Sequence, residues 1–187
     1  MEVPWTGIAV DLLKNESESE AHLQRSPLGF VPVLQTPHGY LSESMAILDY
    51  LESVHPSPSL YPHDPWLRAK AIELTEIIVS DTQPLQNLNP QELHSSDPEK
   101  KKAWAKYWIE RGLQAYETQV TATHGRFSVG DQITVADLVL IPQLYNALRY
   151  DVSLEQFPHC ARIWENCKSE PSYQKSEPAS FQPPATT

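Results

Sequence analysis

Residues 30–51 read FVPVLQTPHGYLSESMAILDYL, and this stretch decides the fold of the first third of the chain. The mostly apolar segment GFVPVL (29–34) predicts a strand. The turn residues TPHGY (36–40) follow, with Gly39 free to adopt positive φ. A second short strand, Tyr40–Ser42, then completes a hairpin. Residues 44–54 predict a helix, because apolar side chains recur there at helical spacing: Met45, Leu48 and Leu51.

Composition sets the class of protein. The chain has 187 residues, 40% of them hydrophobic, and a formal net charge of −10. That length allows one large domain or two small ones. A protein this acidic is a poor partner for nucleic acid or for an anionic membrane. We therefore expect neither partner.

The two cysteines, Cys160 and Cys167, indicate a reduced protein. On one helix they would lie about 10 Å apart, too far for a disulfide. Neither they nor the seven histidines show the spacing of a metal site. The first residues are too polar for a signal peptide, and no apolar run is long enough to span a bilayer. We expect a cytoplasmic protein without a metal.

The segment 55–65, HPSPSLYPHDP, holds four prolines and predicts a domain boundary. We expect a small domain at 1–55 that opens with a strand at 4–13, a linker at 56–65, and an all-helical domain at 66–170. The Pro-rich tail 171–187 is expected to be disordered. The fold class is α+β.

Helical periodicity and capping signals support the second domain. Two apolar stripes stand at helical spacing: Leu67, Ala71, Leu74 and Ile78 in the first, and Ala105, Ile109, Leu113, Tyr116 and Val120 in the second. Pro84 should end or kink the first helix. Thr134 and Asp137 predict a capping box, with Ile133 and Leu138 as its hydrophobic staple.

Two short elements carry the chemistry. Val31-Pro32 suits a sheet edge where a cis peptide can sit and where an extended peptide can pair with the backbone of Val31. Ser44 at a helix start can simply cap that helix. Alternatively, the helix N-terminus and the Ser44 hydroxyl bind a carboxylate, while Glu43 binds an ammonium group. The second interpretation describes a site for the α-amino-acid end of a small peptide.

This arrangement resembles the glutathione site of the glutathione transferase superfamily. The segments QPLQNL (83–88), FSVGDQITVADLVLIPQL (127–144) and NALRYDV (146–152) further resemble its zeta class, also known as maleylacetoacetate isomerase. The resemblance runs from about residue 5 to residue 170. It implies a thioredoxin-like N-terminal domain, here truncated, and an all-helical C-terminal domain. It also implies glutathione as cofactor, a small electrophile as substrate and a homodimer.

The resemblance assigns roles residue by residue. Glutathione would contact Val31, Pro32, Glu43 and Ser44, and Gln83 and Asn87 would reach it from the second domain. The alternative for Gln83 and Asn87 is that they satisfy backbone groups freed by Pro84. Arg149 would bind the substrate carboxylate, or else it only complements a helix C-terminus. The rim also differs from the family, since Gly29-Phe30 replaces the usual polar pair.

The resemblance also leaves the catalytic residue unknown. The family stabilises the glutathione thiolate with a Ser-Ser-Cys-type motif that would precede Met1, and neither Ser26 nor Ser42 takes that role. Three functions remain open. The first, slightly favoured by the altered rim, is a diverged copy that isomerises or conjugates a small acid, enone or quinone in secondary metabolism. The second is a maleylacetoacetate isomerase of tyrosine catabolism, and the third a non-catalytic dimerising or binding module.

Overall fold

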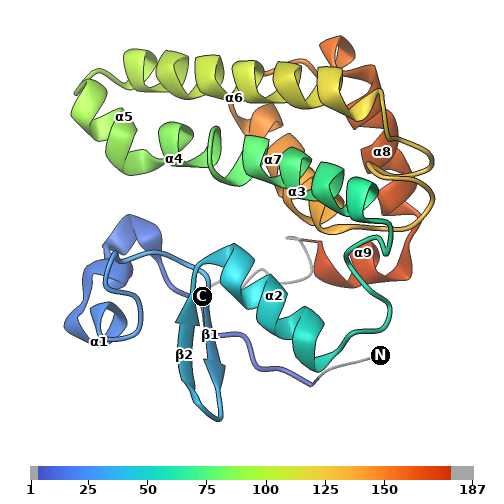
Figure 1. Ribbon diagram of the computed structural model, residues 1–187. Coiled ribbons are helices and arrows are strands. Elements are labelled where there is room, and N and C mark those ends of the chain that lie inside the picture. Colours follow the sequence, from blue (N-terminus) through green and yellow to red (C-terminus); the bar gives the residue numbers. More distant parts are fainter. Residues whose placement is uncertain (1–3, 178–187) are drawn as a thin grey trace. The chain divides into compact units, whose positions relative to one another are not determined.

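The computed structural model describes residues 4–177 and divides the chain into two compact units. Unit 1 contains the residues up to Ser59, and unit 2 begins at Leu60 (Figure 1). Within the described residues, no helix combines the length and the apolar character needed to cross a bilayer.

Unit 1 is built on one hairpin. β1 (Val33–Thr36) pairs antiparallel with β2 (Gly39–Ser42), and α2 (Ser44–Val54) follows at once (Figure 1). Gly39 adopts a φ of 133°, which explains why glycine suits the turn. Before the hairpin lie short helical turns: η1 (Leu12–Lys14), η2 (Glu16–Glu18) and α1 (Glu20–Leu23). The predicted hairpin and the predicted helix 44–54 are confirmed, but the first strand begins at Val33, so the strand expected from Gly29 is wrong for residues 29–32.

The predicted strand at 4–13 is wrong. Residues 4–11 have no regular structure, and η1 starts at Leu12. Among the described residues, the sheet contains only β1 and β2. The apolar bias of PWTGIAV is typical of strands, but a strand also needs a neighbour to pair with its N–H and C=O groups. Residues 4–11 join neither β1 nor β2 in a ladder.

In its described part, unit 2 is built from helices joined by loops, with one isolated β-bridge between His124 and Gly130. Its elements are α3 (Pro65–Val79), α4 (Gln83–Gln86), α5 (Leu88–His94), α6 (Pro98–Val120), α7 (Val135–Arg149), η3 (Leu154–Gln156), α8 (Pro158–Lys168) and α9 (Pro171–Ser176). α3 packs against α6 and α7, and α8 packs against the same two helices (Figure 1). Pro84 stands at the start of α4, so α3 ends before it as predicted.

The core of unit 2 consists mainly of the two predicted stripes. Apart from Leu67, which is 37% exposed, every member has no accessible surface: Ala71, Leu74, Ile78, Ala105, Ile109, Leu113, Tyr116 and Val120. The expectation of a disordered tail is wrong for 171–176, which form α9. Proline at the first turn and a neighbouring helix, α8, favour this helix. The rest of the tail, from residue 178, lies outside the described residues.

Asp137 holds the loop before α7. It has no accessible surface, and its carboxylate accepts hydrogen bonds from the Ser128 N–H at 2.8 Å, the Thr134 N–H at 2.8 Å and the Thr134 hydroxyl at 3.1 Å. The predicted capping box is therefore present. Burial raises the pKa of the Asp137 carboxyl, and the hydrogen bonds offset part of that rise.

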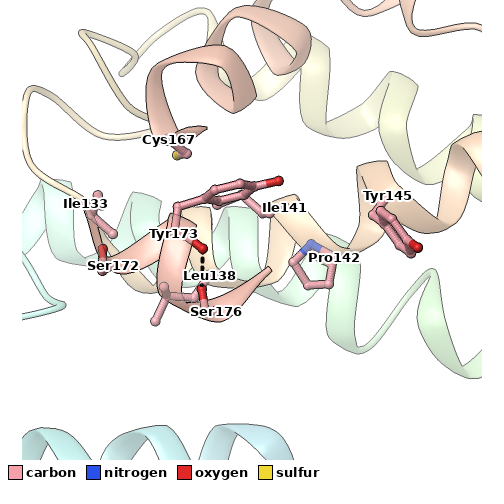
Figure 2. Close-up of a pocket in the computed structure, with 9 residues that line it drawn as sticks. All are labelled: Ile133, Leu138, Ile141, Pro142, Tyr145, Cys167, Ser172, Tyr173 and Ser176. Atoms are coloured by element: carbon pink, nitrogen blue, oxygen red, sulfur yellow. Dashed lines mark hydrogen bonds between the residues drawn. The ribbon is translucent and has the colours of Figure 1, made fainter. Parts of the chain in front are cut away.

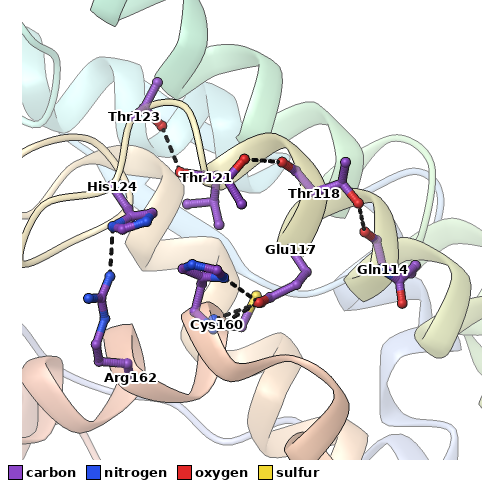
Figure 3. A network of polar contacts seen from close by, with 10 residues as sticks. Gln114, Glu117, Thr118, Thr121, Thr123, His124, Cys160 and Arg162 are labelled. Carbon is purple, nitrogen blue, oxygen red and sulfur yellow. Dashed lines mark hydrogen bonds and ion pairs between the residues drawn. The ribbon is translucent and has the colours of Figure 1, made fainter.

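Glu117 of α6 joins that helix to the start of α8 (Figure 3). Its carboxylate accepts from the backbone N–H groups of His159 at 2.8 Å and Cys160 at 3.0 Å, and it contacts His159 Nδ1 at 2.6 Å. Glu117 thus caps α8 from another helix. Burial raises the pKa of Glu117, but these hydrogen bonds outweigh burial, and the pKa lies below its ordinary value.

This geometry predicts a pH-dependent contribution of Glu117 to stability. A carboxyl whose pKa is lowered on folding stabilises the protein above its unfolded pKa, and that stabilisation is lost as the pH falls through the folded pKa. We expect Glu117→Gln to lower Tm at pH 6–7 and the difference from wild type to shrink between about pH 5 and pH 3. Thermal unfolding of both proteins between pH 3 and pH 7 measures this difference in Tm. Glu155→Gln, at an exposed position, is the control, and a pH-independent difference would contradict the prediction.

Candidate functional site

The four site residues predicted in unit 1 lie at one end of the hairpin. The register pairs Val33 with Ser42. Val31 and Pro32 directly precede β1, and Glu43 and Ser44 directly follow β2. Because the strands are antiparallel, both pairs stand at the same end of the ladder. The structure therefore brings together two elements that are a dozen residues apart in sequence.

The start of α2 offers free donors. Its first internal hydrogen bond joins the Ile47 N–H to the Glu43 carbonyl, so the N–H groups of residues 44–46 have no partner within residues 4–177. The Ser44 side chain is exposed and likewise unpaired in this part of the chain. Unpaired N–H groups, a hydroxyl and the helix dipole together suit a carboxylate.

Glu43 adopts an unusual backbone conformation, with φ 72° and ψ 119°. A non-glycine residue with positive φ is strained, and such strain occurs often at functional sites. The Glu43 side chain is exposed and makes no capping bond to α2. It also has no ion pair with any described residue. This carboxylate can therefore receive an ammonium group beside the donors of α2.

The backbone of Val31 is open. Its peptide bond with Pro32 is cis, its side chain is 42% exposed, and β1 begins only at Val33. Neither its N–H nor its C=O bonds to another described residue. An extended ligand can therefore pair with this residue as an added strand.

Two buried side chains fix the residue before Val31. His22 Nε2–H donates to the Phe30 carbonyl at 3.0 Å, and the Phe30 N–H donates to Ser26 Oγ at 3.2 Å. His22 is 7% exposed and Ser26 is 1% exposed. The spacing of His22 and Ser26 in the sequence carries no signal for this arrangement, because nothing in it points to Phe30. Both backbone groups of Phe30 are thus used, and those of Val31 stay free.

In unit 2, Gln83 is the first residue of the short helix α4, and Asn87 directly follows its last residue. The polar groups around the break at Pro84 are satisfied by other residues: Thr82 Oγ1 donates to the Ile77 carbonyl at 2.6 Å, and Trp104 Nε1 donates to the Leu85 carbonyl at 2.7 Å. Gly112 of α6 makes room for Thr82, since a Cβ there would collide with the threonine side chain. The side chains of Gln83 and Asn87 make no hydrogen bond within the described chain, which favours a ligand over a purely structural role.

Arg149 is the last residue of α7 and is exposed. No ion pair or side-chain hydrogen bond of Arg149 exists within residues 4–177, although acidic residues outnumber basic ones by 24 to 14 in the sequence. Its position at the helix C-terminus is favourable for a cation. Its five N–H donors nevertheless remain available for a carboxylate.

The pocket drawn in Figure 2 lies in unit 2 and has a volume of about 310 Å³. Ile133 and Leu138, the predicted staple, line it together with Ile141, Pro142 and Cys167. Residues with hydroxyl groups complete the lining, and Arg149 is not part of it. An apolar wall without a cation is a poor place for a carboxylate.

No described residue is assigned to thiolate activation. Ser26 is buried and already accepts from Phe30. Cys160 and Cys167 are free and buried, and burial raises the pKa of both, that of Cys167 to about 12. Neither is a thiolate at neutral pH. Among the residues described, no cluster of three His, Cys, Asp or Glu side chains could hold a metal ion.

Two family models match the chain. The glutathione S-transferase N-terminal domain matches residues 3–59, and the glutathione S-transferase C-terminal domain matches residues 86–175. The predicted α+β class, with a thioredoxin-like domain followed by a helical one, is thereby confirmed. These models define the general class of protein.

Individual relatives narrow the class. The chain is 39% identical, over 95% of its length and 78% of the relative's, to probable maleylacetoacetate isomerase 2 of Drosophila melanogaster. It is 34% identical to maleylacetoacetate isomerase of Rattus norvegicus, over 91% of this chain and 79% of that protein, and 34% identical to the glutathione S-transferase zeta class of Euphorbia esula, over 91% and 77%. The chain belongs to the glutathione S-transferase family and, within it, to the zeta class.

Solved structures of maleylpyruvate and maleylacetoacetate isomerases are also similar to this chain. A maleylpyruvate isomerase, a bacterial glutathione S-transferase of the zeta class, superposes with a TM-score of 0.92 at 32% identity and covers 98% of this chain and 89% of its own. Maleylacetoacetate isomerase from Anaeromyxobacter dehalogenans 2CP-1, with glutathione bound in its active site, gives a TM-score of 0.85 at 43% identity, over 96% and 85% of the two chains.

The contact of Ser26 with Phe30 can be tested without a ligand. Ser26→Ala removes the acceptor of the Phe30 N–H, and we expect that amide to exchange with solvent about 5- to 20-fold faster. Residue-resolved hydrogen exchange measures the rate. Ser96→Ala, at an exposed serine whose side chain bonds to no described residue, is the matched control. An unchanged Phe30 rate, or equal acceleration across β1, would contradict a local role.

Proposed function

We propose that the protein binds glutathione at the end of the β1–β2 hairpin and uses it to isomerise a small cis-unsaturated dicarboxylic acid to its trans form. The observation that carries the proposal is the unpaired donor set at the start of α2 beside the open backbone of Val31. The maleylacetoacetate isomerase from Anaeromyxobacter dehalogenans 2CP-1, crystallised with glutathione in its active site, supports it.

Each part of glutathione has a chemically matched group in this proposal. The γ-glutamyl carboxylate accepts from the first N–H groups of α2 and from the Ser44 hydroxyl. Its ammonium group pairs with the Glu43 carboxylate. The cysteinyl backbone pairs with Val31, and cis-Pro32 lies next to that contact. Gln83 and Asn87 are further candidate ligands of glutathione.

The chemistry uses the cysteinyl sulfur. The thiolate adds to one carbon of the activated double bond, the bond between the two carbons becomes single and rotates, and the thiolate then leaves with the trans isomer formed. Glutathione is regenerated and acts as a cofactor. A free thiol with a pKa near 8.5 is only a few per cent ionised at pH 7, so the holoenzyme must stabilise the thiolate. Arg149 is the group we propose for the substrate carboxylate.

The relatives favour the catabolic role over the tailoring role that the altered rim suggested. The compared proteins from Drosophila, Dictyostelium and rat are named maleylacetoacetate isomerases, and the maleylpyruvate isomerase of similar fold acts on a comparable acid. We therefore propose a maleyl-substituted keto acid as the substrate class. We further propose a homodimer, since family members of this kind dimerise and α3 exposes Trp66 and Ile72.

Glutathione binding tests the first half of the proposal. We expect the chain to bind glutathione in titration calorimetry and Ser44→Ala to weaken binding about 10- to 100-fold, because a hydrogen bond to a charged carboxylate contributes about 1.5–3 kcal/mol. Ser96→Ala should leave Kd unchanged. Equal affinity of Ser44→Ala and wild type would show that Ser44 only completes the helix.

Isomerisation tests the second half. With maleylpyruvate or maleylacetoacetate and catalytic glutathione, we expect conversion to the trans isomer without consumption of glutathione. The vinyl proton coupling constants in NMR measure this conversion. Arg149→Met should lower kcat/KM about 100-fold. The kcat/KM of Arg149→Lys should lie between those of wild type and Arg149→Met, because lysine keeps the charge but loses the bidentate geometry.

Lys100→Met is the matched control for these assays, since it removes an exposed cation that has no ion pair in the described chain. Glutathione binding without any isomerisation would favour the non-catalytic binding module. Absence of glutathione binding would overturn the proposal altogether.

A further inference from the structure

Two buried glutamines join α4 to the middle of α7. Gln86 Nε2 donates to Gln143 Oε1 at 2.9 Å, and Gln143 Nε2 donates to Gln86 Oε1 at 2.8 Å. Gln143 has no accessible surface, and Gln86 is 7% exposed. The two amides thus satisfy each other reciprocally, away from water, in one defined orientation.

A third buried glutamine extends this connection to the end of α7. Gln91 of α5, 6% exposed, donates from Nε2 to the Gln86 carbonyl at 2.6 Å and to the Tyr150 hydroxyl at 3.0 Å. Tyr150 directly follows Arg149. Lys102 and Lys106 of α6 hold the next residue, Asp151, through its carboxylate at 2.5 Å and its carbonyl at 2.9 Å.

These contacts lie next in sequence to two of the three polar side chains proposed for ligands in unit 2. Asn87 lies directly after Gln86, and Arg149 lies directly before Tyr150. Gln143 precedes Arg149 by six residues, about 9 Å along a helix. A bond at Gln143 fixes the rotation of α7 about its axis, and a bond at Tyr150 fixes its end. Apolar packing alone would fix neither as strictly, because it is not directional.

We infer that Gln86, Gln91, Gln143 and Tyr150 form an amide clamp, a set of positioning residues that holds Arg149 at a set distance and angle from Asn87. The inference rests on the proposed function, in which Arg149 binds the substrate carboxylate. It explains why the segments QPLQNL, LIPQL and NALRY occur together in this sequence, since each supplies a member of the clamp. The clamp residues themselves touch no substrate.

A paired substitution separates positioning from packing. Gln143→Met alone leaves the Gln86 amide buried without a partner and should lower Tm by roughly 3–10 °C. Gln86→Met with Gln143→Met replaces both amides by apolar groups of similar shape, which restores most of the stability. We expect the double variant to regain Tm and still to bind malonate, an unreactive dicarboxylate, about tenfold more weakly in the presence of glutathione.

Tyr150→Phe provides a second, milder variant. It removes only a hydroxyl, and we expect malonate to bind several-fold more weakly with Tm nearly unchanged. Gln114→Met, at an exposed glutamine, is the matched control for both. Calorimetry gives Kd and thermal unfolding gives Tm, and both use the full chain.

The outcomes are distinct. If the double variant and Tyr150→Phe both bind malonate as wild type does, the clamp is only core filling and the inference is wrong. If both bind more weakly at restored stability, the inference stands. If the unmodified chain binds glutathione but no malonate, the proposed carboxylate site falls, and the clamp inference falls with it; that result is visible before any variant is made.

Discussion

The buried carboxylate of Asp137 is the constraint on which unit 2 depends. It accepts three hydrogen bonds from Ser128 and Thr134 and so fixes where α7 begins. Tyr116 of α6 donates to the Ser128 hydroxyl from the other side, which ties the same loop to the longest described helix. A charge at this depth is costly unless its oxygens are satisfied, and here every donor is local. The start of α7 thereby sets the position of everything further along it, Arg149 included.

Polar residues in this protein fall into two groups with different purposes. Gln86, Gln91, Gln143 and Glu117 are buried, and each is hydrogen-bonded to another helix. Glu43, Ser44, Asn87 and Arg149 are exposed, and their side chains make no contact of this kind within the described chain. Buried polar groups give directional contacts that specify one packing. Exposed, unengaged ones are available to a ligand.

Much of the fold was predictable from local pattern. The helix 44–54, the hairpin before it, both apolar stripes and the capping box at Thr134 all follow from periodicity and capping chemistry, which depend on neighbours within a turn or two. The strand expected at 4–13 failed because strand formation depends on a partner elsewhere in the chain. The expectation of disorder was wrong for residues 171–176 because amino-acid composition does not show that α8 lies beside them.

By itself, the sequence determined the elements, the family and the chemical types of the site residues, since these reside in residue identity and short spacing. The tertiary structure alone decided which polar residues are free. Gln83 and Gln86 belong to the same motif, yet within residues 4–177 only the Gln86 side chain forms a hydrogen bond, and its partner Gln143 is 57 residues away. His22 and Ser26 likewise carry no signal in sequence for their contact with Phe30. Such pairs form because folding brings distant side chains within hydrogen-bonding distance, and no local pattern encodes that distance.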